Sequence, residues 1–218
     1  MPAATYHLPL ATDRPRVILL HGIWMRAGVT ARLDARLSAA GFVVTRFDYA
    51  SLRSPQHEHH RRLDALIAAL DGPLHLVGHS LGGVVAIDYL QRPGGHAARV
   101  GRVVCLGSPL LGSTLARRLQ RMRLDALGLG HAREVLIDGL TPWSGPQQIG
   151  VIAGEVSFGL SLLLGRLPRP NDGTVAVAET RLPGIHDHAT VRASHTALLF
   201  SERAAALTVR FLREGSFA

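Results

Sequence analysis

The sequence has no lysine, so all 24 of its basic residues are arginine, and the formal charge is +8 at pH 7. Excess positive charge is typical of proteins that bind nucleic acid or anionic membranes. Here, however, the arginines accompany abundant alanine, glycine and leucine, a composition that a GC-rich genome imposes on many proteins. We therefore attribute the charge mainly to codon bias and expect no nucleic-acid partner.

Cysteine and long apolar runs are also scarce. The single cysteine, Cys105, cannot form a disulfide within the chain, and its apolar neighbours predict a buried strand residue. The longest apolar segment, residues 156–167, is interrupted by serine and glycine and is shorter than the roughly 20 residues that cross a bilayer. Residues 1–7 lack a basic region followed by an apolar run. We therefore expect a cytoplasmic protein without a transmembrane segment, although a mature secreted form would look the same.

With 218 residues, 47% of them hydrophobic and 18% charged, residues 1–218 are expected to form one globular domain. Apolar strand patterns alternate with amphipathic helix patterns, which predicts an α/β fold with a mostly parallel sheet of about six strands and helices on both faces. The expected strands are residues 16–20, 42–47, 74–77, 100–106 and 148–153, and the expected helices are residues 31–40, 56–70 and 196–212.

Two insertions, around residues 112–147 and 155–170, follow predicted strand ends. Ligands bind beyond the carboxyl ends of strands in open parallel sheets, so we expect these insertions to act as cap-like elements over a pocket. For residues 155–170 two interpretations stay open: a lid or acyl-binding wall, or an extra packed helix.

The most informative motif is Gly-His-Ser-Leu-Gly-Gly at residues 78–83, which follows an apolar strand pattern and precedes a helix pattern. It reads as a nucleophile elbow, in which a serine occupies a strained turn and small residues let the neighbouring segments approach. The turn also places the serine at a helix N-terminus, where amides favour developing negative charge. The motif therefore predicts that Ser80 is a catalytic nucleophile.

A serine nucleophile needs a histidine to take its proton and a carboxylate to orient that histidine. Where the serine sits on such an elbow, the acid and then the histidine follow it along the chain, and Asp172 and His195 fit that order. Glu155 is the alternative acid and His188 the alternative base. The triplet at residues 186–188 looks like a metal clip but lacks a third ligand of clear spacing, so we expect no metal and no cofactor.

The remaining histidines and the densest basic cluster have ordinary structural interpretations. We expect His21 to organise the loop after the first strand, and His79 to pack or donate a hydrogen bond. Polar, solvent-facing positions are expected for His57, His59 and His60, and a solvated helix face for Arg117, Arg118, Arg121 and Arg123.

Together these motifs resemble the small α/β-hydrolase lipases and esterases, including minimal bacterial lipases and the branch that deacylates lipid anchors. The matching segments are residues 19–24, 78–83, 107–113, 171–175 and 187–195. The resemblance implies the α/β-hydrolase fold and an oxyanion hole formed by the amides of Ile23 and Leu81. It departs at Trp24 and Met25, since the family often has a further glycine here. The candidate substrate-pocket residues are Trp24, Met25, Leu110 and Leu111.

The sequence thus predicts a serine hydrolase that cleaves carboxylic esters, of a small molecule or a lipid, through an acyl-enzyme intermediate. Two alternatives remain. The same residues would serve an acyl-thioesterase or a lipid-anchor deacylase, and the fold is also compatible with a catalytically silent binding module. The sequence does not set the oligomeric state.

Overall fold

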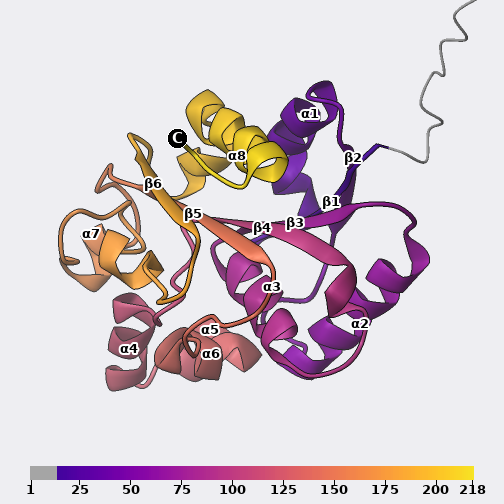
Figure 1. Ribbon diagram of the computed structural model, residues 1–218. Coiled ribbons are helices and arrows are strands. Elements are labelled where there is room, and N and C mark those ends of the chain that lie inside the picture. Colours follow the sequence, from indigo (N-terminus) through magenta and orange to yellow (C-terminus); the bar gives the residue numbers. More distant parts are fainter. Residues whose placement is uncertain (1–13) are drawn as a thin grey trace, which may run out of the picture.

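The computed structural model describes residues 14–218, apart from the side chain of Leu127. The expectation about residues 1–7 lies outside the described residues. Within residues 14–218 the chain forms a six-stranded, fully parallel sheet with strand order β2-β1-β3-β4-β5-β6 (Figure 1). The strands are β1 (Arg16–Leu20), β2 (Val43–Phe47), β3 (Leu74–His79), β4 (Val100–Leu106), β5 (Gln148–Gly154) and β6 (Asp187–Val191).

Helices cover both faces of this sheet (Figure 1). One face is covered by α1 (Ala31–Ala39) and α8 (Glu202–Glu214), and the other by α2 (Gln56–Ala69) and α3 (Leu81–Gln91). The remaining helices are α4 (Thr114–Arg121), α5 (Asp125–Leu129), α6 (Arg133–Asp138) and α7 (Ser161–Leu164). The predicted α/β class and doubly covered parallel sheet are confirmed.

The interior strand β1 shows why the sheet is buried on both faces. Val17 and Leu19 pack into the apolar core beneath α1 and α8, whereas Ile18 and Leu20 pack into the core beneath α2 and α3. Side chains alternate between the two faces of a strand, so a strand covered on both faces reads as a continuous apolar run.

The strand order places a topological switch between β1 and β3. After β1 the chain moves outward to β2, and after β3 it moves the opposite way to β4. The connections at the carboxyl ends of these two neighbouring strands therefore diverge and leave a crevice, which is where open α/β sheets bind ligands. Ile23 follows β1, and Ser80 follows β3.

Two elements differ from the sequence predictions. Residues 187–191, which are not among the strands expected from the sequence, form the edge strand β6. The expected helix at residues 196–212 is instead a 3-10 turn at Thr196–Leu199 followed by the separate helix α8. Ser201 lies at the break and caps α8, because its side chain accepts a hydrogen bond from the Ala204 amide at 3.2 Å.

The two insertions carry the helices α4 to α7. Arginines of α4 tie them together: the Arg117 guanidinium donates to the Ile137 carbonyl at 2.9 Å, and that of Arg118 donates to the Leu164 carbonyl at 3.2 Å. These two arginines are therefore only partly solvated, whereas Arg121 and Arg123 are exposed as predicted.

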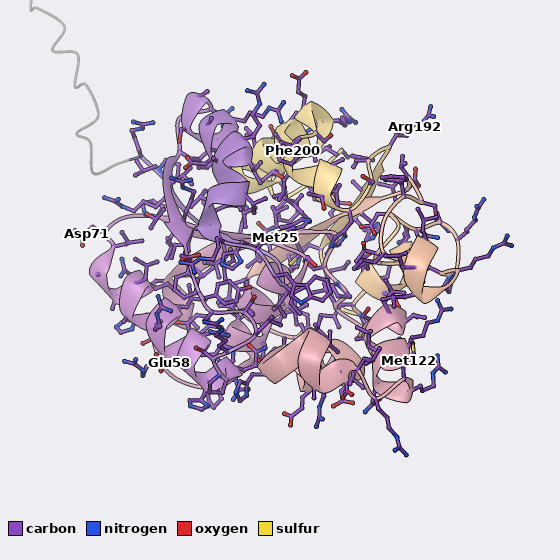
Figure 2. All side chains as sticks on the ribbon, turned by 180° about the vertical axis from the view of Figure 1, so that it is seen from behind. Met25, Glu58, Asp71, Met122, Arg192 and Phe200 are labelled. Atoms are coloured by element: carbon purple, nitrogen blue, oxygen red, sulfur yellow. The ribbon has the colours of Figure 1, made fainter. Side chains whose placement is uncertain are left out.

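Other side chains that end in nitrogen point outward along much of the outline of the molecule, and Arg192 is one of them (Figure 2). No helix within residues 14–218 is both long and apolar enough to span a bilayer.

The expectation that His59 and His60 are exposed is also wrong. His60 is buried on α2, with its Nε2 atom 3.1 Å from an Asp88 carboxylate oxygen. His59 is 1% exposed and packs edge-on against the Tyr49 ring, with centroids 4.7 Å apart. Neither ring nitrogen of His59 has a hydrogen-bond partner among the described residues, and burial lowers its pKa to about 4.

We therefore expect His59→Phe to raise the free energy of unfolding by about 1 kcal/mol near neutral pH, because phenylalanine keeps the edge contact without burying an unpaired polar group. The gain should grow as the pH falls below about 6.5, where histidine in the unfolded chain takes up a proton that buried His59 resists until about pH 4. Urea unfolding of both proteins at about pH 7 and about pH 5 measures this. A variant that is less stable at both values would contradict the account.

Candidate active site

The predicted elbow is present, with Ser80 between the end of β3 and the start of α3. Ser80 has φ 55° and ψ −122°, a conformation that a non-glycine residue rarely adopts. A Cβ atom on Gly78 would collide with the backbone of Gly83, and one on Gly82 would collide with the carbonyl oxygens that end β1. The Ser80 amide donates to the Leu106 carbonyl at 2.8 Å. The glycines thus let α3 press against the sheet and hold the serine in its strained turn.

Asp172 and His195 form a buried pair. His195 Nδ1 lies 2.7 Å from Asp172 Oδ2, and the other carboxylate oxygen accepts from the amides of Thr174 at 2.9 Å and Val175 at 2.7 Å. A carboxylate can only accept, so Nδ1 carries the proton and Nε2 is free to accept one. The pair therefore holds the imidazole in the tautomer that a general base requires.

Backbone contacts fix this pair in place. The His195 amide donates to the Asp172 carbonyl at 2.9 Å, which joins the two loops directly. Gly107, after β4, packs so closely against the pair that an added Cβ would lie 3.1 Å from Asp172 Oδ2 and 3.2 Å from His195 Nδ1. Loops from three strand ends thus converge on the imidazole.

Ser80 and His195 line the same cavity, of about 430 Å³, which we call the outer cavity. Both side chains are otherwise buried, each residue being 7% exposed. Most of the other lining residues are apolar or small: Ile23, Trp24, Met25, Phe158, Gly159, Leu160, Leu163, Thr174, Ser194 and Thr196. The sequence pointed to Trp24 and Met25 in this set.

The amides of Ile23 and Leu81 are available as donors. Leu81 is the first residue of α3, so its amide has no acceptor within the helix, and neither amide donates a hydrogen bond to any residue in the range 14–218. A Cβ on Gly22 would lie 3.1 Å from Ser80 Cβ, so the loop carrying Ile23 lies against the elbow. Both amides therefore belong to segments that adjoin Ser80.

His21 organises the loop that carries Ile23. Its Nδ1 atom donates to the Gly22 carbonyl at 2.8 Å, its Nε2 accepts from the Tyr49 amide at 3.3 Å, and the Tyr49 hydroxyl donates to the His21 carbonyl at 2.7 Å. Burial lowers the pKa of His21, which keeps the ring neutral and able to accept.

His79 supports the loop that carries His195. Its Nε2 donates to the His195 carbonyl at 3.0 Å, and the two imidazole centroids are 4.8 Å apart. Burial, followed by the neighbouring His195, lowers the pKa of His79 to about 3, so the ring stays neutral at physiological pH. His79 can thus position His195 without placing a second positive charge beside it.

We expect His79→Leu to lower kcat roughly tenfold with little change in KM, because it removes a hydrogen bond worth about 1 kcal/mol from the loop that orients His195. His79→Gln, whose amide can still donate, should recover much of the loss. Steady-state kinetics on the two variants separates a positioning role from simple packing. Equal losses in both would show that the hydrogen bond plays no part.

The structure does not bring the alternative groups to this cavity. Glu155 is exposed and lines a separate cavity with Arg169 and Asn171. His188 is in β6 with its Nε2 atom 2.9 Å from the Thr180 hydroxyl, and burial lowers its pKa to about 4. Among residues 14–218 no three histidine, cysteine, aspartate or glutamate side chains gather as a metal site.

Two candidate pocket residues also lie elsewhere. Leu110 is fully buried in the core beneath α3, and Leu111 is 39% exposed; neither lines the outer cavity. The sequence does not single out Phe158, Leu160 and Leu163 individually, although all three fall in the segment 155–170, for which it leaves open a lid or wall and an extra packed helix.

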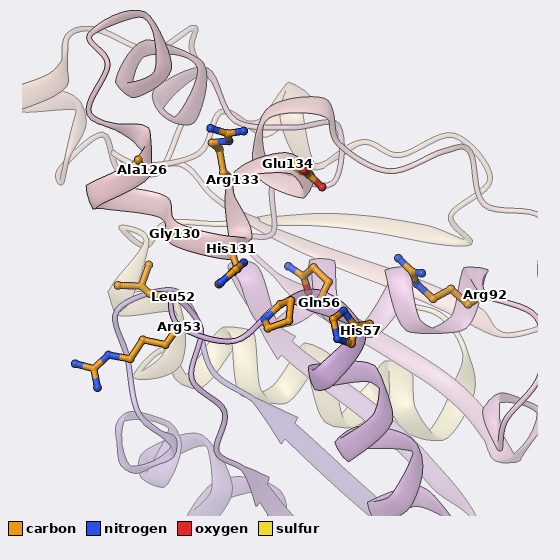
Figure 3. Close-up of a pocket in the computed structure, with 11 residues that line it drawn as sticks. Leu52, Arg53, Gln56, His57, Arg92, Ala126, Gly130, His131, Arg133 and Glu134 are labelled. Carbon is orange, nitrogen blue, oxygen red and sulfur yellow. The ribbon is translucent and has the colours of Figure 1, made fainter.

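A larger cavity, of about 770 Å³, lies between the start of α2 and the segment from α5 to α6 (Figure 3). Arginines and histidines line much of it: Arg53, His57, Arg92, His131 and Arg133. Neither Ser80 nor His195 reaches it, and it holds no serine or cysteine nucleophile. We therefore place the candidate chemistry at the smaller cavity.

Comparisons with known proteins agree with the fold. A model of a family described as alpha/beta hydrolases matches residues 17–210. No curated protein is significantly similar in sequence.

Among solved structures, a Bacillus licheniformis lipase is 19% identical with a TM-score of 0.72, the match covering 95% of this chain and 94% of that one. A metagenomic carboxyl esterase is 18% identical with a TM-score of 0.65, over 94% and 77% of the two chains. The pyrethroid hydrolase PytH is 16% identical with a TM-score of 0.65, over 93% and 99%. At these identities the structural matches establish a shared fold.

Proposed function

The chain belongs to the alpha/beta hydrolase family, and from that premise we propose that it is a serine hydrolase that cleaves carboxylic esters through an acyl-enzyme intermediate. Family membership makes hydrolysis the expected reaction class. The esterase and lipase activities named for the structural neighbours are compatible with the proposal, but the assignment to this chain rests on its own residues.

In the proposed mechanism, Ser80 Oγ attacks the ester carbonyl while His195 Nε2 takes its proton. Asp172 holds the imidazole and stabilises the imidazolium, and the amides of Ile23 and Leu81 donate to the tetrahedral oxyanion. His195 then returns the proton to the leaving alcohol. Water next attacks the acyl-enzyme by the same route and releases the acid.

The observation that carries this proposal is the hydrogen bond between His195 Nδ1 and Asp172 Oδ2, at the wall of the cavity that also exposes Ser80. A buried carboxylate that fixes a histidine tautomer beside a strained serine is costly to maintain for structure alone. The same groups would also act on thioesters, so the acyl-thioesterase and lipid-anchor deacylase alternatives stay within the proposal.

We further propose that residues 112–147 and 155–170 act as walls of the substrate site within one domain. Leu115 and Leu119 of the first insertion, and Leu160 and Leu164 of the second, line cavities that open at Ser80. This assigns residues 155–170 to an acyl- or alcohol-binding wall. A cytoplasmic location stays a prediction.

The purified protein should hydrolyse p-nitrophenyl acetate and lose that activity in proportion to labelling by a fluorophosphonate, with one label per chain at full inhibition. An acyl-thioester assayed alongside ranks the two substrate classes. A folded protein that neither hydrolyses acyl substrates nor takes up the label would instead be the catalytically silent binding module.

A further inference from the structure

A second cavity also opens at Ser80, and His195 is not among the residues that line it. This inner cavity has a volume of about 50 Å³ and lies under the insertion helices. Leucines from α4, α5, α6 and α7 close it, namely Leu115, Leu119, Leu129, Leu136 and Leu164. Five residues line both cavities and form the boundary between them: Ile23, Trp24, Ser80, Leu160 and Thr174.

The proton path decides which part of an ester occupies each cavity. When the tetrahedral intermediate collapses, the bond from carbon to the alcohol oxygen breaks, and His195 gives that oxygen the proton it took from Ser80 Oγ. The alcohol oxygen must therefore lie within hydrogen-bond reach of His195. His195 lines the outer cavity and does not line the inner one. The alcohol thus belongs in the outer cavity and the acyl group in the inner one.

The two cavities differ greatly in capacity. A cavity needs a volume of about 10–15 Å³ to hold one water molecule, which is one non-hydrogen atom. At about 50 Å³, the inner cavity therefore has room for roughly three to five non-hydrogen atoms. The outer cavity, at about 430 Å³, is more than eight times larger. Its rim is also apolar and open, because Trp24, Phe158 and Leu163 are 50%, 69% and 85% exposed.

The Trp24 side chain forms one anchored part of the boundary between the cavities. Its φ is 58°, and its indole Nε1 donates to the Gly128 carbonyl at 2.8 Å, which anchors the ring on α5. This hydrogen bond ties the Trp24 part of the boundary to the insertion helices.

From this partition, which rests on the proposed ester hydrolysis, we propose that the preferred substrates join a short acid of about two to four carbons to a larger apolar alcohol. Esters of a long fatty acid with a small alcohol would have to place the long acyl chain in the small inner cavity. The selectivity comes from the packed leucines of the inner cavity, because close-packed interiors resist insertion of extra methylene groups.

Octyl acetate and methyl nonanoate test this directly, since they are isomers with the same atoms but with the bulk on opposite sides of the ester bond. We expect kcat/KM for octyl acetate to exceed that for methyl nonanoate by roughly 100-fold, the scale of discrimination by a few methylene groups in an apolar pocket. Acid release by the wild-type protein, followed at constant pH below the solubility limit of each ester, gives both values.

Equal rates, or a preference for methyl nonanoate, would overturn the assignment. The absence of hydrolysis of both esters would also overturn it. Fluorophosphonate labelling then shows whether the substrate assignment or the proposed function is wrong. A labelled Ser80 means that only the substrate assignment is wrong, whereas an unlabelled Ser80 means that the proposed function itself fails.

Enlarging the inner cavity should shift the acyl preference. Leu119→Ala, and the milder Leu119→Val should the alanine variant not fold, are expected to raise the ratio of p-nitrophenyl hexanoate to p-nitrophenyl acetate hydrolysis about tenfold and several-fold respectively. Met122→Ala, at the end of the same helix and pointing outward at the molecule's edge (Figure 2), is the matched control and should leave the ratio unchanged. A folded Leu119 variant with the wild-type ratio would contradict the proposal.

Discussion

Ser80→Ala should lower kcat on p-nitrophenyl acetate by about 10⁶-fold, the scale found when a serine nucleophile is removed from a working triad. The variant keeps the strained backbone, the Asp172–His195 pair and both candidate oxyanion amides, so only the attacking oxygen is lost. Residual hydrolysis would come from water held near those groups.

The same variant should fold as well as the wild type, because its Cβ atom and backbone contacts are retained. Ser38→Ala is a suitable control, since this exposed serine donates only to Asp34 on the surface of α1. Thermal unfolding and steady-state rates of the three proteins separate loss of chemistry from loss of structure. A Ser80→Ala protein with near wild-type kcat would exclude Ser80 as the nucleophile.

Asp172→Asn should lower kcat by about 10⁴-fold, because it should hold His195 in the tautomer that cannot act as a base. The Thr174 and Val175 amides both donate to Asp172 Oδ1, so in the variant they retain the single carbonyl oxygen of the asparagine. The asparagine NH₂ then faces His195 Nδ1 as a donor. Nδ1 must accept, Nε2 must carry the proton, and His195 can no longer take one from Ser80.

Glu155→Gln is the matched control for this substitution, because Glu155 was the alternative acid in the sequence and is exposed in the structure. It should change kcat by less than about twofold. Rates of both variants, with thermal unfolding to verify the fold, decide between the two carboxylates. A large loss in Glu155→Gln, or wild-type activity in Asp172→Asn, would mean that the acid has been misassigned.

The sequence was most informative where chemistry depends on local geometry. The elbow could be predicted because a Cβ on Gly78 would collide with Gly83 in the same turn, so the need for a glycine shows within one short motif. Asp172 and His195 could be proposed from chain order, even though the contact between them spans loops from different strands. Their catalytic roles stay predictions until the variants are measured.

Features set by distant contacts could not be read from the sequence. His59 lies in a polar stretch, and only packing against Tyr49, from another element, shows that it is buried. Strand β6 is a half-exposed edge whose residues mix polar and apolar types without clear alternation, so it resembled a loop. By contrast, the break before α8 had a usable signal, since Ser201 followed by Glu202 is typical of a helix start.

The substrate cavities were also beyond the sequence. Leu119 and Leu136 come from separate helices of one insertion, and only the folded structure shows that they line the same small cavity beside Ser80. The volume of a cavity depends on how all of its lining side chains pack together, so it cannot be predicted from any one residue.

The central claim is that an acyl group is transferred to Ser80. Rapid quenching of the wild-type protein during turnover of p-nitrophenyl acetate, followed by peptide mass spectrometry, tests it most directly. The account predicts one acetyl group on Ser80, in the peptide containing residues 78–83, and none in the Ser80→Ala variant. Full turnover with no acetylated serine, or with the acetyl group on another residue, would contradict it.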